Sequence, residues 1–345
     1  MKALRTFGPE ASRIVDEPRP QAGPGEVLIS IRAVGICHTD LEILGGYHPE
    51  YASGIAHYPI VVGHEWSGEV VEVGAEVTSV NIGDSVVGET GIGCMCCDLC
   101  KSGRYHLCPF GTETGVINRD GGLREYHVAP ALSLHKHALP HEQACLIEPA
   151  SVGIYAAIKA GIGPGDTAEV IGDGAIGLLC VQAAKAAGAA EVTLVGHHDD
   201  RLQLGQRLGA DRTVNSRSAD AVHTLTELNG SCRPAVVIEA AGSAEALDIA
   251  LHLVARSGVV AVVGYSAAEP YRHSLASIIG GEIELLGVRG SPNCWPRTIR
   301  LIETGAMVVE PLVGPRFALD DFAEALSAAQ SGQTGAARVI IEPSS

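Results

Sequence analysis

The sequence carries little positive charge and no long apolar run. Its 345 residues include 24 Lys and Arg against 40 Asp and Glu, a formal net charge of −16. A nucleic-acid-binding protein needs a basic face, so this balance argues against nucleic acid and against an anionic membrane surface as partners. No apolar stretch reaches the length of a membrane span. The first residues lack the basic-then-apolar pattern of a signal peptide, so we expect a cytoplasmic protein with reduced thiols.

Internal repeats and low-complexity segments are also missing. Hydrophobic residues make up 46% of the chain, and its 42 glycines are scattered without a period. This composition is typical of a soluble globular protein rather than a fibrous or disordered one. A chain of this length is too long for one ordinary core and predicts two domains.

Strand-like segments dominate the first third of the chain. Partly alternating, β-branched runs predict strands at residues 26–37, 69–74 and 83–89. In the middle of the chain, short apolar strands alternate with helical runs, which indicates a doubly wound parallel sheet. These strands are expected at residues 168–172, 191–195, 235–242 and 258–264. The tail returns to a mixed pattern of two helices and a final strand.

These patterns predict an α/β protein of two domains. The N-terminal part and the tail together form a β-rich domain, residues 1–149 and 288–345. Residues 150–287, which lie between them, form a Rossmann-type domain that binds a dinucleotide.

A glycine motif supports the dinucleotide-binding domain. The segment VIGDGAIGLL has the pattern G-x-G-x-x-G, where it closes a predicted strand and opens a predicted helix. One glycine makes the tight turn, another lets the backbone approach the pyrophosphate, and the third allows close helix packing. The helix N-terminus then faces the phosphates. The expected cofactor-binding residues of this turn are Gly172, Gly174, Ala175, Ile176 and Gly177.

The end of the second predicted strand favours one nicotinamide cofactor over the other. NAD-binding domains usually carry an acidic residue there, bonded to the ribose 2′-hydroxyl. This chain has Gly196 at that position, followed by His197 and His198, with Arg201 three residues further. A small residue followed by donors that can carry a positive charge favours a 2′-phosphate, so we expect NADP(H) to be preferred over NAD(H).

Five cysteines fall within fifteen positions, in the segment CMCCDLCKSGRYHLC. Cys94, Cys97, Cys100 and Cys108 fit the spacing C-x2-C-x2-C-x7-C. Four thiolates complete a tetrahedral zinc with no open position, so this pattern predicts a structural site. Cys96 is surplus and could replace one ligand if the register of the loop differs.

A second set of metal-ligating residues is dispersed along the chain. Cys37, His64, Glu65 and Glu148 come from three separate segments. A zinc held by three protein ligands keeps an open position and acts as a Lewis acid. The segment GHEWSG is not H-E-x-x-H, so a metalloprotease is not indicated. Ligands gathered from several segments are instead typical of a catalytic zinc.

Together these motifs resemble the zinc-dependent medium-chain alcohol dehydrogenases, over essentially the whole chain. The segments GIC, GHEWSGEVVEVG and IEPASVGIYA are similar to the sorbitol and threonine dehydrogenase branch. The resemblance implies a GroES-like catalytic domain, a homodimer or homotetramer, and two zincs per chain. It assigns the catalytic zinc to Cys37, His64, Glu65 and, directly or through water, Glu148.

The resemblance also implies roles around the reacting alcohol. His38 would lie near the cofactor pyrophosphate, and Thr39 would take the proton of the substrate hydroxyl. Glu42 stands where many relatives continue the proton relay with a histidine. Gly290 and Ser291 stand where sorbitol dehydrogenases have an Arg-Tyr pair, which puts a sorbitol-like substrate in doubt.

The interpretation is therefore a zinc-dependent oxidoreductase. It would interconvert a secondary alcohol (a polyol, cyclitol or amino alcohol) and its ketone by hydride transfer with NAD(P). One alternative is a non-catalytic NADP-binding or structural protein on the same fold, since fold does not fix function. A second is a zinc-independent enone or quinone reductase, which the two cysteine-containing sets disfavour.

Overall fold

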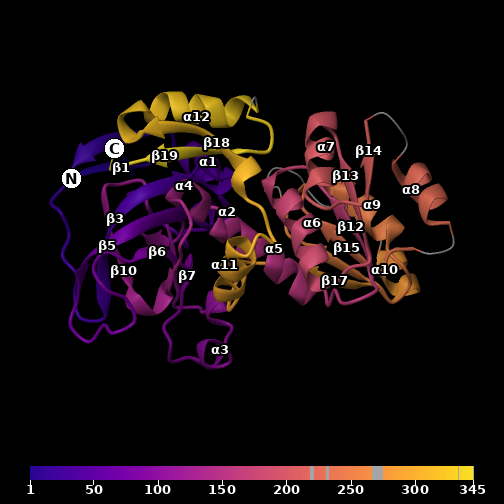
Figure 1. Cartoon of the computed structure of the whole chain (residues 1–345), viewed down its shortest axis with the longest axis horizontal. Helices are drawn as coiled ribbons and strands as arrows, with labels where there is room; N and C mark the ends of the chain where they lie inside the picture. Colours follow the sequence, from indigo (N-terminus) through magenta and orange to yellow (C-terminus); the bar gives the residue numbers. More distant parts are fainter. Residues whose placement is uncertain (218–220, 231–232, 266–274, 333, 345) are drawn as a thin grey trace. The chain divides into compact units, whose positions relative to one another are not determined.

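The computed structural model describes residues 1–217, 221–230, 233–265, 275–332 and 334–344. The chain divides into two compact units, each discontinuous in sequence (Figure 1). Unit 1 comprises Met1–Glu148, Gly290–Glu303 and Val309–Ser345. Unit 2 comprises Pro149–Arg289 and Thr304–Val308. Among the described residues, no helix is long and apolar enough to cross a membrane.

Unit 1 is built on a seven-stranded sheet with strand order β11-β6-β5-β3-β19-β18, and β10 also pairs with β3. Its central strand β3 is buried along most of its length because both of its faces are covered, which matches its nearly continuous apolar run. The strands are β3 (Glu26–Gly35), β5 (Glu65–Val73), β6 (Ser85–Gly88), β10 (Tyr126–Pro130), β11 (Leu134–Lys136), β18 (Val313–Ala318) and β19 (Arg338–Glu342).

Two small sheets and several short helices complete unit 1. The sheets are β2-β1-β4 and β7-β8-β9, made of β1 (Lys2–Thr6), β2 (Ser12–Asp16), β4 (Ile60–Val61), β7 (Gly91–Ile92), β8 (Thr112–Thr114) and β9 (Asn118–Arg119). The α-helices are α1 (His38–Gly45), α2 (Pro49–Ala52), α3 (Asp98–Lys101), α4 (His141–Ala144), α11 (Trp295–Glu303) and α12 (Phe322–Ser331). Short 3-10 turns are η1 (Tyr105–Leu107), η2 (Ala131–Ser133), η3 (Glu310–Leu312) and η4 (Leu319–Asp321).

Unit 2 contains a six-stranded parallel sheet of order β14-β13-β12-β15-β16-β17. Numbered along the unit, this is the order 3-2-1-4-5-6 of a doubly wound nucleotide-binding sheet. Its strands are β12 (Thr167–Ile171), β13 (Glu191–Gly196), β14 (Arg212–Asn215), β15 (Val236–Glu239), β16 (Val259–Val262) and β17 (Glu284–Gly287). Its helices are α5 (Ile147–Lys159), whose first two residues fall in unit 1, α6 (Ala175–Ala187), α7 (Asp199–Arg207), α8 (Ala221–Asn229), α9 (Ala244–Leu253) and α10 (Leu275–Gly281).

The predicted α/β fold class is confirmed, and the four apolar strands predicted in the middle of the chain form the centre of the parallel sheet. The two strands that the sequence did not reveal, β14 and β17, are its edge strands. Central strand β15 is buried at every position, whereas most positions of β14 and β17 are half-buried or exposed. An edge strand needs no continuous apolar run, so it leaves little trace in the sequence pattern.

A buried hydrogen-bonded chain fixes helix α4 against strand β5 in unit 1. The Leu139 backbone N–H donates to His137 Nδ1 at 3.2 Å, so the proton of the neutral ring lies on Nε2. His137 Nε2 then donates to Ser67 Oγ at 2.9 Å, and the Ser67 hydroxyl donates to His141 Nδ1 at 2.8 Å. Burial, aided by the neighbouring His141, lowers the pKa of His137 to about 4.

The lowered pKa of His137 predicts a loss of stability in mild acid. The unfolded chain protonates His137 below about pH 6.5, whereas the folded chain protonates it only below about pH 4. In the range between these values, protonation stabilises the unfolded chain alone. Between pH 7 and pH 5 the free energy of unfolding should therefore fall by about 2 kcal/mol more in the wild type than in His137→Gln. Urea titrations followed by tryptophan fluorescence measure this, because Trp66 and Trp295 both lie in unit 1.

The control is His57→Gln, which removes an exposed histidine of the same unit. Its pH dependence should match that of the wild type. A His137→Gln variant whose stability falls as steeply as that of the wild type would contradict the role given to the buried chain.

Candidate metal centres and active site

Three potential zinc ligands meet at the ends of two paired strands in unit 1. Gly35, the last residue of β3, pairs with Glu65, the first residue of β5. Cys37 lies two residues beyond Gly35 and caps the N-terminus of α1, and His64 directly precedes β5. Each of Cys37, His64 and Glu65 offers one ligand atom, and these three atoms lie within 4.8 Å of one another. Thiolate, imidazole and carboxylate at this separation fit a zinc ion.

The absence of a side chain at Gly35 makes this approach possible. A Cβ atom at Gly35 would lie 2.5 Å from Oε2 of Glu65, well inside the contact distance of the two atoms. The register of β3 and β5 therefore places the Glu65 carboxylate directly over Gly35, where a side chain would displace it.

Asp40 organises the same cluster from the first turn of α1, and the sequence did not single it out. Its Oδ2 accepts the Cys37 backbone N–H at 2.8 Å, and its Oδ1 accepts the Gly63 N–H at 3.0 Å. Oδ1 also lies 3.5 Å from Nδ1 of His64. A carboxylate in this place orients a metal-bound histidine. Burial lowers the pKa of His64, but the charges of Asp40 and Cys37 outweigh it and raise that pKa above its usual range.

Arg338 is the second residue that sequence reasoning missed. Its Nε and Nη2 atoms donate to the two oxygens of Glu65 at 3.1 and 3.0 Å, and Nη2 lies 3.8 Å from the Cys37 sulfur. Strand β19, which begins at Arg338, pairs with the end of β3 and so brings the guanidinium to the cluster. The sequence does contain a local signal for Asp40, because an acid three residues after a helix cap is a capping pattern. Arg338 has no such signal, because it lies 301 residues from Cys37 in the chain.

Glu148 lies outside this compact set. Its Oε1 accepts a hydrogen bond from the Thr90 hydroxyl at 3.3 Å. Burial, together with the negative charge of Glu65, raises the pKa of Glu148, while His64 opposes the shift. Thr39 lies beside the cluster, since its Oγ1 is 3.9 Å from the Cys37 sulfur.

His38 and Glu42, one turn apart on α1, differ in burial. His38 is largely exposed, and its Nε2 lies 3.9 Å from Oε1 of the buried Glu42. Burial raises the pKa of Glu42, and the nearby charge of Glu50 adds to the shift. Glu42 is therefore a buried carboxyl group at the position where the resemblance would place a relay histidine.

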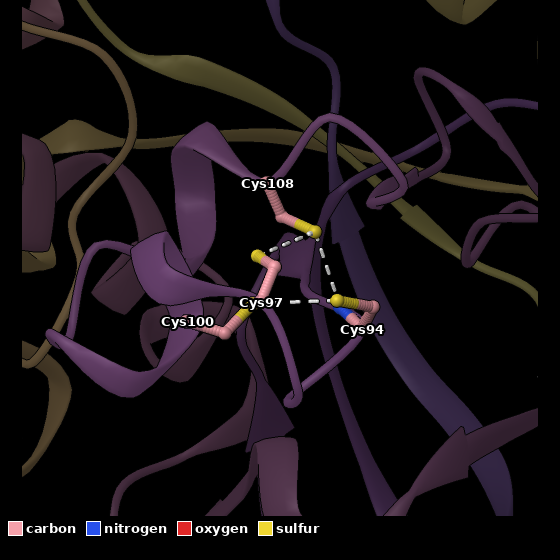
Figure 2. A group of neighbouring side chains, drawn as sticks. All are labelled: Cys94, Cys97, Cys100 and Cys108. Carbon is pink, nitrogen blue, oxygen red and sulfur yellow. Dashed lines mark hydrogen bonds between the residues drawn. The ribbon is translucent and has the colours of Figure 1, made fainter.

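The four-cysteine loop closes around a common centre (Figure 2). The sulfurs of Cys94 and Cys100 are 3.9 Å apart, and those of Cys97 and Cys108 are 3.8 Å apart. A tetrahedral zinc with bonds of about 2.3 Å holds its sulfurs about 3.8 Å apart, so the four thiols fit a closed zinc site. Gly93 permits this closure, because a Cβ atom there would lie 2.6 Å from the Cys100 sulfur.

The surplus thiol stands beside this centre. The exposed Cys96 is not one of the four clustered cysteines, although its sulfur lies 3.5 Å from that of Cys94. Backbone N–H groups of Cys96 and Cys97 lower the pKa of Cys94, which favours the thiolate that a metal binds.

The glycine-rich turn of unit 2 has the shape of a phosphate cradle. Gly172 follows β12 with φ of 120°, in the region that favours glycine. A Cβ atom at Gly177 would lie 1.8 Å from the Gly172 carbonyl oxygen, so helix α6 packs on the turn only with glycine there. Gly174 caps α6, and Ala175 and Ile176 form the first residues of the helix. A Cβ atom built on Gly174 would have no other atom within 4 Å, so the space in front of the helix is open. The open helix N-terminus fits a pyrophosphate.

At the end of β13, the predicted cofactor residues surround a carboxylate from the glycine-rich turn. Asp173, also missed by sequence reasoning, accepts the backbone N–H groups of His197 and His198 at 2.7 Å each. Its side chain lies 3.1 Å from Nδ1 of His198 and 3.7 Å from Nη1 of Arg201. Gly196, His197, His198 and Arg201 are thus brought together, with a negative charge among them.

Comparisons with known proteins agree with this geometry. Residues 23–140 match the family model described as alcohol dehydrogenase GroES-like domain, and residues 175–304 match that of zinc-binding dehydrogenase. The chain is 32% identical over 350 residues to a sorbitol dehydrogenase of Bacillus subtilis, covering 99% of this chain and 97% of the relative. It is 32% identical to an L-threonine 3-dehydrogenase of Shewanella frigidimarina, covering 97% and 98% of the two chains. The chain belongs to the zinc-dependent medium-chain alcohol dehydrogenases.

A solved structure extends this assignment. The chain is similar to a zinc-binding dehydrogenase from Sinorhizobium meliloti bound to NADP, with 30% identity, 99% coverage of both chains and a TM-score of 0.90. Within the family, the dehydrogenase belongs to the sorbitol and threonine dehydrogenase branch. It is an NAD(P)-dependent oxidoreductase that interconverts a secondary alcohol and its ketone. Membership of this family of zinc-binding dehydrogenases excludes the non-catalytic protein and the zinc-independent reductase that were the alternatives.

The position of Asp40 predicts weaker zinc retention when its charge is removed. Asp40→Asn should lower the affinity of the Cys37–His64–Glu65 cluster for zinc by about 10- to 100-fold, because the histidine loses its orienting carboxylate. Zinc per chain after dialysis against a series of chelator concentrations measures the loss. The matched control is Asp84→Asn, a carboxylate of the same unit that also accepts a backbone N–H. Equal zinc retention in the two variants would refute the positioning role.

Proposed function

We propose that this dehydrogenase oxidises a polyol, cyclitol or amino alcohol at a secondary carbon, uses two zinc ions per chain, and prefers NADP(H). The observation that carries the proposal is the Cys37–His64–Glu65 cluster with Thr39 beside it. The relatives named for sorbitol and threonine support a hydroxyl substrate with further polar groups.

The catalytic zinc is proposed to be held by Cys37, His64 and Glu65, with Glu148 as a ligand reached directly or through water. When bound there, zinc acts as a Lewis acid on the substrate oxygen, and the nicotinamide accepts or donates the hydride. Thr39 Oγ1 would accept the proton of the substrate hydroxyl while its own hydroxyl proton passes on, to Glu42 or to water. Arg338 holds the Glu65 carboxylate in place, and the Thr90 hydroxyl donates to the carboxylate of Glu148.

The structural zinc is proposed to be bound by Cys94, Cys97, Cys100 and Cys108, whose four thiols leave no open position. The cofactor pyrophosphate is proposed to lie over Gly174, Ala175 and Ile176 at the start of α6, with His38 as a further partner on the family resemblance. Gly196, His197, His198 and Arg201 receive the adenosine ribose, and the Arg201 guanidinium together with the two imidazoles favours a 2′-phosphate. The NADP bound by a similar structure supports this preference.

The substrate is proposed to differ from sorbitol in the part that would contact residues 290 and 291 of unit 1. Gly290 and Ser291 replace an Arg-Tyr pair of sorbitol dehydrogenases. Ser291 is buried, and its Oγ accepts the indole N–H of Trp295 at 3.1 Å. Small residues that are already engaged leave room for a bulkier or differently functionalised substrate.

Domain limits, assembly and location complete the proposal. We assign residues 1–149 and 288–345 to the catalytic domain and residues 150–287 to the cofactor domain. The family resemblance supports a homodimer or homotetramer, which light scattering of the purified protein measures. The nine cysteines that the structure describes are free, which supports a reducing compartment, the cytoplasm.

Metal analysis and activity together test the function. Polyols, cyclitols and amino alcohols are screened with NADP and NAD, and with their ketones in reverse, by nicotinamide absorbance. The wild type should contain two zincs per chain. Cys37→Ser should contain one and lose on the order of a thousandfold in kcat/KM, since the Lewis acid contributes about 4 kcal/mol.

The matched variant is Cys97→Ser, which should also lose one zinc. Its main loss should be in thermal stability, whereas the main loss of Cys37→Ser is in kcat/KM. A Cys37→Ser enzyme with full activity would overturn the catalytic assignment. A wild-type kcat/KM much higher with NAD than with NADP would overturn the cofactor preference alone.

A further inference from the structure

Asp173 occupies the space in which the second strand of a dinucleotide-binding sheet normally carries its acid. It stands between the first two glycines of the turn after β12, yet its side chain reaches the end of β13. A Cβ atom at Gly196 would lie 2.5 Å from the Asp173 Cβ and 2.6 Å from its Oδ2. Position 196 is therefore glycine because the carboxylate is supplied from the neighbouring turn.

The two oxygens of Asp173 are unequally used. Oδ2 accepts both the His197 and the His198 backbone N–H at 2.7 Å, with Nδ1 of His198 at 3.1 Å. Oδ1 has longer contacts, 3.3 Å to Nδ1 of His198 and 3.7 Å to Nη1 of Arg201. Oδ2 thus fixes the turn, whereas Oδ1 retains acceptor capacity among the described residues.

The side chain is buried and ionised. Burial raises the pKa of Asp173, but the two backbone N–H groups and His198 outweigh burial and lower it. The buried negative charge attracts the Arg201 guanidinium and lies within hydrogen-bond distance of Nδ1 of His198, and these are the side chains proposed to receive a 2′-phosphate.

We propose that Asp173 tunes the choice between the two nicotinamide cofactors. Its Oδ1 accepts the ribose 2′-hydroxyl of NAD(H), and its charge competes with the 2′-phosphate of NADP(H) for Arg201 and His198. The inference rests on the proposed cofactor site at the end of β13. It makes the preference for NADP(H) moderate, because the site carries an acceptor for one cofactor and cations for the other.

Asp173→Asn separates the two functions of the side chain. Because a single oxygen, Oδ2, accepts both backbone N–H groups, the one carbonyl oxygen of Asn preserves the turn. The amide NH2 then replaces Oδ1, so an acceptor for the 2′-hydroxyl becomes a donor toward a 2′-phosphate and the negative charge is lost.

The experiment compares two probes that differ only in the 2′-phosphate, adenosine 5′-monophosphate and adenosine 2′,5′-bisphosphate. Their dissociation constants are measured by calorimetry on the full-length wild type and on Asp173→Asn. The affinity ratio in favour of the bisphosphate should rise about tenfold in the variant. The ratio of kcat/KM for NADP over NAD should rise in the same direction.

Asp211→Asn is the matched control in the same unit. Asp211 also accepts a backbone N–H, that of Val192 at 2.7 Å, and also pairs with a cation, but at the opposite end of β13. Its removal takes away the same charge and should leave the probe ratio within about twofold of wild type. Should Asp173→Asn fold poorly, Arg201→Met keeps the test, with the bisphosphate bound at least about fivefold more weakly and the monophosphate unchanged.

The outcomes are distinguishable. If the wild type binds both probes and the ratio stays unchanged or falls in Asp173→Asn, Asp173 does not tune the choice, and the proposed cofactor site stands. If the wild type binds neither probe, the cofactor site and this inference both fail.

Discussion

The ion pair between Arg338 and Glu65 is the contact on which the catalytic cluster depends. A buried charge is costly unless it is paired and hydrogen-bonded, and here both carboxylate oxygens of Glu65 meet the guanidinium. The pair joins three strands, because Glu65 begins β5, Arg338 begins β19, and both strands flank β3. It also places the guanidinium 3.8 Å from the Cys37 sulfur, so the same arginine contacts two members of the cluster.

The two clusters of potential metal ligands show why some sites can be predicted from a sequence. The four cysteines of the loop lie within fifteen residues, so their spacing alone indicates their geometry. The glycine-rich turn is equally local, and the structure gives it the shape that the motif implies. Cys37 lies in a different segment from His64 and Glu65, so the sequence proposes them as one set from their residue types, and strand pairing brings them together.

What the sequence could not reveal are the residues that act across a fold. Arg338 reaches Glu65 through strand pairing between distant segments, and no local pattern marks it. Asp173 is hidden in a different way, because its acid is displaced from the strand end to the adjacent turn. The edge strands β14 and β17 escaped because partial exposure removes their apolar pattern. The central strands were readable for the opposite reason, since burial on both faces requires continuous apolar side chains.

The discontinuity of unit 1 has a consequence for how the enzyme matures. Strand β19 follows every residue of unit 2 in the chain, so on the ribosome the cofactor sheet is synthesised before Arg338 exists. Domains generally fold as they emerge. The four cysteines of the loop are all synthesised before unit 2, whereas Glu65 has no guanidinium partner until the tail pairs with β3. The order of synthesis therefore supplies all residues of the four-cysteine cluster early, and the arginine of the Cys37–His64–Glu65 cluster last.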